Sequence, residues 1–103
     1  MILCCGEALI DMLPRHLPDG EATFAPHAGG AVFNTAVALG RLGQQTGFFS
    51  GLSTDMFGKG LTDALTASNV DTTLAVRSPR PTTLAFVELV DGQARYAFYD
   101  ENT

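Results

Sequence analysis

The sequence predicts an α/β fold built on a parallel sheet, and three segments support this. Residues 1–6 form a short apolar run that ends in glycine, which is typical of a strand buried on both faces. Residues 28–43 read as a glycine turn followed by a largely apolar helix, and residues 44–50 form a β-prone run directly after it. Strand, helix and strand in this order indicate a βαβ-like unit with a right-handed crossover.

The helix over residues 31–42 is the element around which the rest is organised. Gly29 and Gly30 remove both Cβ atoms at its entry, so the backbone there can take a positive φ and a ligand can approach closely. Arg41 in the last turn complements the carbonyl end of the helix, and Gly43 is a natural stop.

Two polar side chains interrupt apolar surroundings. Asn34 places an amide in the first turn of the helix, where it either donates to and accepts from a hydroxylated ligand or caps the turn. Asp11 lies in an apolar segment, and an unpaired buried carboxylate is costly. Its carboxylate therefore either faces a cleft or receives backbone N–H groups at a strand end. The residues alone leave both pairs of alternatives open.

The remaining short segments follow from turn chemistry. Residues 14–20 hold two prolines and an Asp-Gly pair and are expected to be a loop, and residues 21–28 are a strand candidate that leads into the glycine turn. Residues 70–76 are another strand candidate, and residues 78–81 form a stiff proline loop.

A second helix is expected after residue 55. Ser53, Thr54 and Asp55 all offer N-caps, because their side-chain oxygens can accept hydrogen bonds from the first helical N–H groups. Asn69 is expected to end this helix.

Residues 83–99 give the clearest short-range prediction. Two β-prone runs flank Asp91 and Gly92, the preferred filling of a type I′ turn. A two-residue loop places Glu88 opposite Arg95, a favourable cross-strand pair.

One face of this hairpin is apolar and is expected to pack mostly on the core. Its residues are Ala85, Val87, Leu89, Ala94, Tyr96 and Phe98. Phe98, nearest the open end, is the candidate to line a pocket.

Composition excludes several classes of function. The formal net charge of −5, with six dispersed Lys and Arg residues, argues against nucleic acid and anionic membranes. No apolar run approaches the ~20 residues of a membrane span. Cys4 and Cys5 are adjacent and are expected to be reduced, buried thiols of a cytosolic protein. No metal site is expected, since His16 and His27 are isolated and no second Cys cluster exists.

Several motifs of known chemistry are missing. No Gly-Lys-Ser/Thr follows Gly29-Gly30, so the turn is not a Walker A loop, and Gly6 stands alone where a dinucleotide fingerprint needs three glycines. No Gly-x-Ser-x-Gly nucleophile turn is present.

The motifs that are present resemble the N-terminal half of the ribokinase-like (PfkB) carbohydrate kinases. They are residues 6–11, 29–36, 47–51 and 55–58, and the spacing from the double glycine to Gly58 looks like the family's first signature. The Gly-Glu-Ala-Leu-Ile-Asp opening and the closing Tyr-Ala-Phe-Tyr-Asp-Glu-Asn-Thr look most like bacterial fructokinases. The resemblance covers essentially all 103 residues.

The resemblance implies a fold and a site. The fold would be the N-terminal portion of an α/β/α sandwich with a small β-sheet lid, its lid strands within residues 12–29 and 83–100. Residues 1–103 would be the sugar-binding portion of the kinase domain, with the C-terminal ATP-binding portion outside the chain. The residues that match the family's sugar-hydroxyl positions are Asp11, Gly29, Gly30 and Asn34, and Phe98 lies in a stretch that helps to cover the sugar.

The resemblance also implies an activity, the transfer of the ATP γ-phosphoryl group to a sugar hydroxymethyl, most simply D-fructose to fructose 6-phosphate. Alternatives are a kinase for 2-keto-3-deoxygluconate or another sugar, or a non-catalytic sugar-binding or interaction module. The family's catalytic aspartate belongs to a Gly-Ala-Gly-Asp motif, expected beyond Thr103, and the sites of ATP and Mg²⁺ would lie mostly there too. A cytoplasmic protein, with a homodimer formed through the lid, is expected. Residues 1–103 alone are expected to be inactive.

Overall fold

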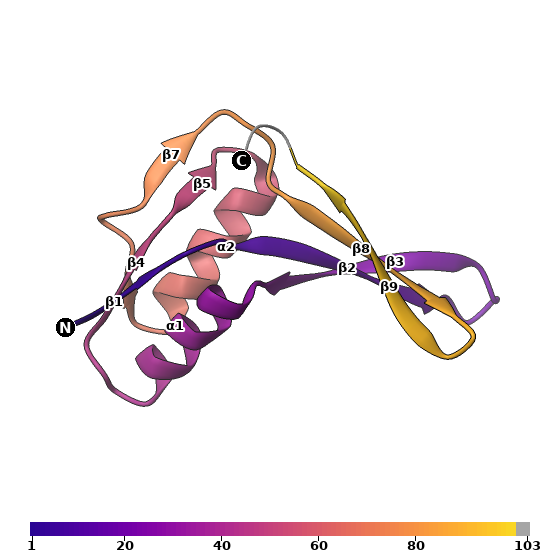
Figure 1. Cartoon of the computed structure of the whole chain (residues 1–103), viewed down its shortest axis with the longest axis horizontal. Helices are drawn as coiled ribbons and strands as arrows, with labels where there is room; N and C mark the ends of the chain where they lie inside the picture. The colour runs from indigo at the N-terminus through magenta and orange to yellow at the C-terminus, as the bar shows by residue number, and fades with distance from the viewer. Residues whose placement is uncertain (101–103) are drawn as a thin grey trace.

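The computed structural model describes residues 1–100 and shows a body from which an elongated arm projects (Figure 1). The body contains the helices α1 (Ala31–Arg41) and α2 (Met56–Ala67). Its three-stranded sheet has the order β1-β4-β6 and consists of β1 (Ile2–Cys5), β4 (Thr46–Phe49) and β6 (Val70–Asp71). A two-stranded sheet continues it with β5 (Gly51–Ser53) and β7 (Val76–Ser78). The arm has the order β3-β2-β8-β9 and consists of β2 (Leu9–His16), β3 (Ala22–Gly29), β8 (Leu84–Val90) and β9 (Gln93–Tyr99).

The body confirms the predicted α/β unit. β1 and β4 are parallel, and β4 is parallel to β6. The main core lies where α1 and α2 pack on this sheet, and the Phe33 and Phe48 rings meet edge to face with centroids 6.2 Å apart. The predicted first helix is confirmed, and Gly43 follows it with a φ of 86°. Such a positive φ suits glycine at the end of a helix.

The prediction that β1 is buried on both faces is wrong. Only Cys4 is buried, whereas Ile2 is 42 % exposed and Leu3 is 45 % exposed. Cys5 is exposed too, so the expectation of two buried thiols holds for Cys4 alone. The reason is that β1 is the edge strand of its sheet and that the described helices cover one face of it. A run of apolar residues therefore identified the strand correctly but not its surroundings.

The prediction that residues 14–20 are a loop is wrong in its first part, because β2 continues through Pro14 to His16. β8 pairs with β2 only over Ile10–Met12, so β2 has β3 as its one ladder partner from Leu13 onward. Proline is tolerated on such an edge. The strand predicted over residues 21–28 is confirmed as β3.

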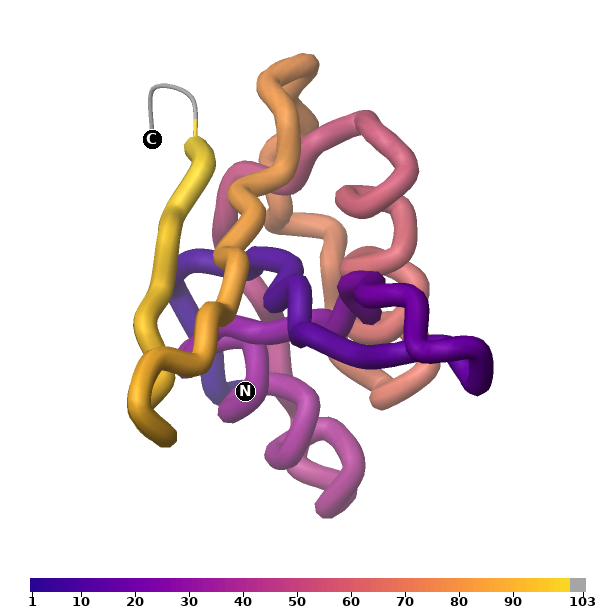
Figure 2. Tube along the Cα trace, turned by 90° about the vertical axis from the view of Figure 1, so that its right-hand side faces the viewer, coloured from indigo at the N-terminus to yellow at the C-terminus, as the bar shows by residue number. Residues whose placement is uncertain are grey.

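The hairpin prediction is confirmed, including its register. Asp91 and Gly92 have φ values of 51° and 77°, and Glu88 stands opposite Arg95. A view toward the tip of the arm shows this turn pointing away from the turn between β2 and β3 (Figure 2). The expectation that the apolar face packs mostly on the core is wrong for β9, where every residue is exposed, and for Leu89 on β8, which is 66 % exposed. Ala85 and Val87 on β8 are buried, but β9 is the outer strand of the sheet.

The second helix begins and ends as predicted. Asp55 is its N-cap, and Asn69 takes a φ of 63° just after it. The prediction of one strand over residues 70–76 is wrong: β6 ends at Asp71, β7 begins at Val76, residues 72–75 lie in neither, and the two strands pair with different partners. The predicted proline loop follows β7 and leads into β8, and residues 101–103 of the resemblance lie outside the described residues.

Gly30→Ala is expected to destabilise the fold far more than Gly20→Ala. Gly30 has a φ of 105°, and a Cβ there would lie 2.7 Å from the carbonyl oxygen of Glu7. Gly20 also has a positive φ, 89°, but a Cβ there would meet nothing within 4 Å. Backbone strain alone costs about 1–2 kcal/mol, so we expect about that loss for Gly20→Ala and at least ~3 kcal/mol for Gly30→Ala. Urea unfolding at low protein concentration, followed by circular dichroism, measures both; equal losses would contradict the close approach of Glu7.

Candidate functional site

Asp11 lies on β2, one of the two central strands of the arm. In the register of the sheet it stands opposite His27 on β3 and opposite Ala85 on β8. Ala85 in turn stands opposite Phe98 on β9. Because cross-strand partners point to the same face of a sheet, Asp11 and Phe98 share one face, about 10 Å apart across two strand spacings. His27, which sequence reasoning considered only as a metal ligand, lies on this face too.

The Asp11 carboxylate rests on Gly29. A Cβ at Gly29 would collide with Asp11 Oδ2, so only glycine leaves room for the carboxylate in this position. Among residues 1–100 no backbone or side-chain group donates a hydrogen bond to the half-buried Asp11 side chain. The alternative in which this carboxylate receives backbone N–H groups is therefore wrong, and its oxygens are available as acceptors.

Asn34 lies one turn into α1, whose N-cap is Gly30. The Asn34 N–H donates to the Gly30 carbonyl oxygen at 2.9 Å, which closes the first helical turn. The side chain of Asn34 is exposed, and no side chain caps the helix. The alternative in which the Asn34 amide caps the turn is therefore wrong, and the amide can both donate and accept.

The structure brings the predicted residues together to different degrees. Asp11 and Gly29 touch, Gly30 follows directly, and Asn34 is in the first turn of the helix that Gly30 opens. Phe98 is 59 % exposed, stacks on Tyr96 with centroids 6.2 Å apart, and lines a shallow cavity of about 340 Å³. That Asp11 and Asn34 act on one ligand stays a prediction.

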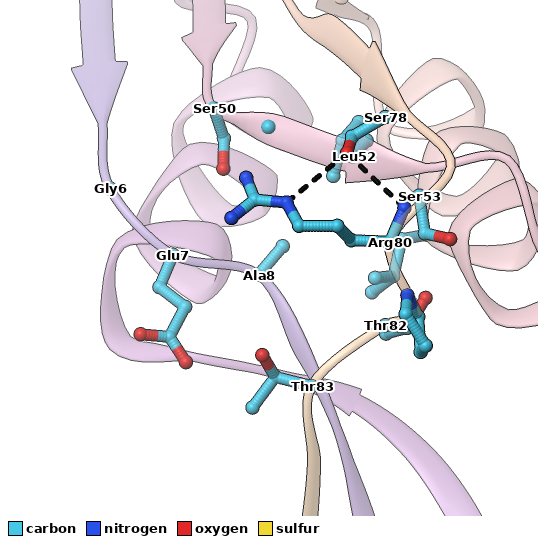
Figure 3. A pocket seen from close by; sticks show the side chains of 13 residues that line it. Gly6, Glu7, Ala8, Ser50, Leu52, Ser53, Ser78, Arg80, Thr82 and Thr83 are labelled. Carbon is cyan, nitrogen blue, oxygen red and sulfur yellow. Dashed lines mark hydrogen bonds between the residues drawn. The ribbon is translucent and has the colours of Figure 1, made fainter. Parts of the chain in front are cut away.

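A second cavity, of about 270 Å³, lies where the carboxyl ends of β1 and β4 meet the start of β8. This edge of a parallel sheet is where α/β proteins usually bind ligands. Its polar lining includes Glu7, Ser50, Ser53, Ser78, Arg80 and Thr82. The Arg80 side chain extends across it, and both its backbone N–H and its Nε–H donate to Ser78 Oγ, at 3.2 Å and 3.3 Å (Figure 3). Sequence reasoning missed Arg80, which it treated only as part of a stiff loop.

Asp55 does more than cap a helix. Its Oδ1 accepts from the Gly58 N–H at 2.8 Å and from Thr82 Oγ1 at 2.6 Å, and its Oδ2 accepts from the Thr82 N–H at 2.8 Å. Burial raises the pKa of Asp55, but the hydrogen bonds from Thr82, Gly58 and Ser53 outweigh it, so the pKa lies below its ordinary value of 3.8. The carboxylate is therefore charged at neutral pH.

Residues 1–100 contain neither a candidate metal site nor a candidate membrane-spanning helix. No group of three or more His, Cys, Asp or Glu side chains lies close enough together to hold a metal ion. No helix in this part of the chain is long and apolar enough to cross a membrane.

Residues 1–103 match the pfkB family of carbohydrate kinases, so the chain belongs to that family. It is 65 % identical over 103 residues to the fructokinase of Rhizobium leguminosarum bv. trifolii, a match that covers 100 % of this chain and 32 % of that protein.

Solved structures agree with this assignment and confirm the ribokinase-like α/β fold. The crystal structure of fructokinase from Xylella fastidiosa superposes with a TM-score of 0.88 at 45 % identity, covering 95 % of this chain and 31 % of that one. A second structure of that protein contains bound ATP. An uncharacterized sugar kinase from Pyrococcus horikoshii gives a TM-score of 0.81 at 35 % identity, covering 97 % and 35 %. The chain thus spans about a third of the length of the relatives that it matches.

Proposed function

We propose that the chain is the sugar-binding portion of an ATP-dependent fructokinase, which converts D-fructose to fructose 6-phosphate. The observation that carries the choice of fructose is the 65 % identity over the whole chain to a protein named fructokinase. The geometry supports a sugar ligand, because Asp11 and Asn34 offer an unengaged carboxylate and amide beside a turn without side chains.

Each residue of the proposed site has a distinct role. The Asp11 carboxylate accepts hydrogen bonds from sugar hydroxyls, and hydrogen bonds to a charged group are the strong ones. The Asn34 amide donates to one hydroxyl and accepts from another. Gly29 and Gly30 let the backbone approach the sugar closely. Phe98 offers an apolar surface on the same face of the sheet as Asp11.

The arm is proposed to act as a lid over the sugar. It consists of β3, β2, β8 and β9; β3, β8 and β9 lie within the residue ranges that the resemblance implied for lid strands, whereas β2 begins at Leu9, before the first of these ranges. Phosphoryl transfer depends mainly on positioning and on stabilising the developing charge, and a lid contributes by excluding water. β9 also leaves a strand edge of seven exposed residues, through which a second copy could pair to form the proposed homodimer.

This portion is not proposed to supply the catalytic base or the ATP site. The base is expected in a Gly-Ala-Gly-Asp motif beyond Thr103, and ATP with Mg²⁺ would supply the phosphoryl group and its charge neutralisation there. What these residues do is bind and orient the sugar. A cytoplasmic enzyme is proposed, in keeping with two cysteines that form no disulfide.

A chimera tests the proposal. Residues 1–103 replace the matching 103 residues of the Rhizobium fructokinase, and ADP release is measured with fructose, 2-keto-3-deoxygluconate or ribose. We expect ATP-dependent turnover that prefers fructose, with the parent enzyme as the positive control. A preference for 2-keto-3-deoxygluconate would support the alternative sugar kinase. A folded chimera that phosphorylates none of the sugars would support the non-catalytic module.

A further inference from the structure

A carboxylate in the body holds the segment that leads into the arm. Asp55 lies at the N-terminus of α2, and Thr82 lies 27 residues later, two residues before β8 begins. Both Thr82 donors, the backbone N–H and the hydroxyl, bond to the two carboxylate oxygens of Asp55, at 2.8 Å and 2.6 Å. Thr82 is only 8 % exposed, whereas Asp55 is partly exposed, so these bonds are partly buried. We name this arrangement the Asp55–Thr82 clamp.

The clamp completes the attachment of the loop between β7 and β8. At the other end of the loop, the Thr54 N–H donates to the Ser78 carbonyl oxygen at 2.9 Å. Between the two attachments lie Pro79 and Pro81, whose fixed φ angles leave the loop little freedom. The clamp and the bond to Ser78 therefore attach both ends of this loop to the segment before α2.

The position of β8 in turn bears on Asp11. The Ile10 N–H donates to the Thr83 carbonyl oxygen at 3.0 Å, and Asp11 stands opposite Ala85 in the parallel ladder. Thr82 therefore lies one residue from the first contact between β8 and β2. A shift of this segment would therefore act on the strand that carries Asp11, whose carboxylate lies against Gly29.

The same segment forms the wall of both cavities. Thr82 lines the cavity at the carboxyl ends of β1 and β4, and it also lines the cavity beside Phe98. Leu84 and Tyr99 line the second of these, and they stand opposite each other at the open end of the hairpin. The clamp thus holds Thr82, which directly precedes the strand segment that lies between Asp11 on β2 and Phe98 on β9.

We infer that Asp55 is a positioning residue for the sugar site: through Thr82 it fixes β8, and so the arrangement of Asp11 and Phe98 over the sugar. The inference rests on the proposed function, since it concerns the same site. It differs from a helix-capping role, because the cap requires only the bond from Gly58 and not the two from Thr82. The lowered pKa of Asp55 is consistent with a carboxylate that stays charged within the clamp.

Substitutions of Thr82 and of Asp55 distinguish the effect of the clamp from the effect of the helix cap. Thr82→Val removes the hydroxyl and leaves the Asp55 cap on α2 intact, whereas Thr82→Ser keeps both donors. Asp55→Ser keeps a good N-cap residue but cannot receive both Thr82 donors. In the active chimera we expect Thr82→Val and Asp55→Ser each to raise the KM for fructose about tenfold, with the KM for ATP changed less than about twofold. Thr82→Ser should behave as the unsubstituted protein.

The combined variant and a sugar-independent measurement complete the test. Because both substitutions break one unit, the double variant Asp55→Ser with Thr82→Val should lose no more than about the larger single effect. In the unsubstituted sugar-free chimera, hydrogen exchange at the Thr82 amide should be slow, and Asp55→Ser should speed it about tenfold or more while the Gly58 amide stays protected. Equal changes in both KM values, or a fructose KM that follows only the loss of thermal stability, would overturn the inference. So would an unchanged Thr82 exchange rate.

An unsubstituted chimera that phosphorylates no sugar would instead refute the proposed function, and the exchange measurement would still decide whether the clamp exists.

Discussion

Asp11→Ala is expected to lower kcat/KM for fructose about 100-fold or more in the chimera, with little change in the KM for ATP. The Asp11 carboxylate is partly exposed and accepts no hydrogen bond from residues 1–100, so the sugar is its proposed partner. Two charge-assisted hydrogen bonds of about 1.5 kcal/mol each amount to about 3 kcal/mol, and each 1.4 kcal/mol is worth tenfold. Initial-rate measurements over a range of fructose and ATP concentrations give the two KM values and kcat.

Two controls sharpen this test. Asp11→Asn keeps the shape and one acceptor oxygen, so we expect a loss intermediate between the alanine variant and the unsubstituted protein. Glu88→Ala removes a carboxylate from the same sheet at an exposed position opposite Arg95, and it should leave fructose kinetics unchanged. An Asp11→Ala enzyme with unchanged kcat and fructose KM would show that this carboxylate does not bind the sugar.

Local turn and cap chemistry was predictable from the sequence, because it is encoded within a few residues. Asp91-Gly92 fixed the hairpin register, and Asp55 and Asn69 were correctly placed at the two ends of α2. The strand over Pro14–His16 was not predictable in the same way. It depends on pairing with β3 and on the limited reach of β8, and neither is visible in the proline pattern itself.

The candidate site also combines features that the sequence predicts with features that only the structure shows. Asp11 and Asn34 stood out because each is a polar residue in an apolar segment. Whether the backbone satisfied them depended on groups distant in the sequence, so only the structure could exclude the two alternatives. The contact between Asp55 and Thr82 spans 27 residues, and no local pattern marks it. The position of Arg80 in the cavity lining was not predictable for the same reason, because the sequence of a proline loop does not show which part of the protein the loop faces.

A polypeptide of residues 1–103 alone is expected to show no kinase activity, and the first reason is chemical. Phosphoryl transfer needs a group that orients or deprotonates the hydroxyl, together with cationic or dipolar stabilisation of the phosphoryl group. The six Lys and Arg residues are dispersed, and Arg80 is the one that lines the cavity at the carboxyl ends of β1 and β4. The residues proposed for the site bind the sugar; none of them is proposed as the base or as a phosphate ligand.

The second reason is physical, and it predicts how this polypeptide behaves in solution. Large apolar side chains are exposed at the β1 edge and next to it, where Met1 is 63 % exposed and Phe49 is 47 % exposed. β9 adds an open strand edge that carries exposed aromatic residues. Apolar surface beside open strand edges promotes association. We therefore expect purified residues 1–103 to scatter light in a concentration-dependent way and to release no ADP above background with ATP, Mg²⁺ and fructose. Sustained turnover by a monodisperse monomer would mean that a catalytic site lies within these residues, and both reasons would then be wrong.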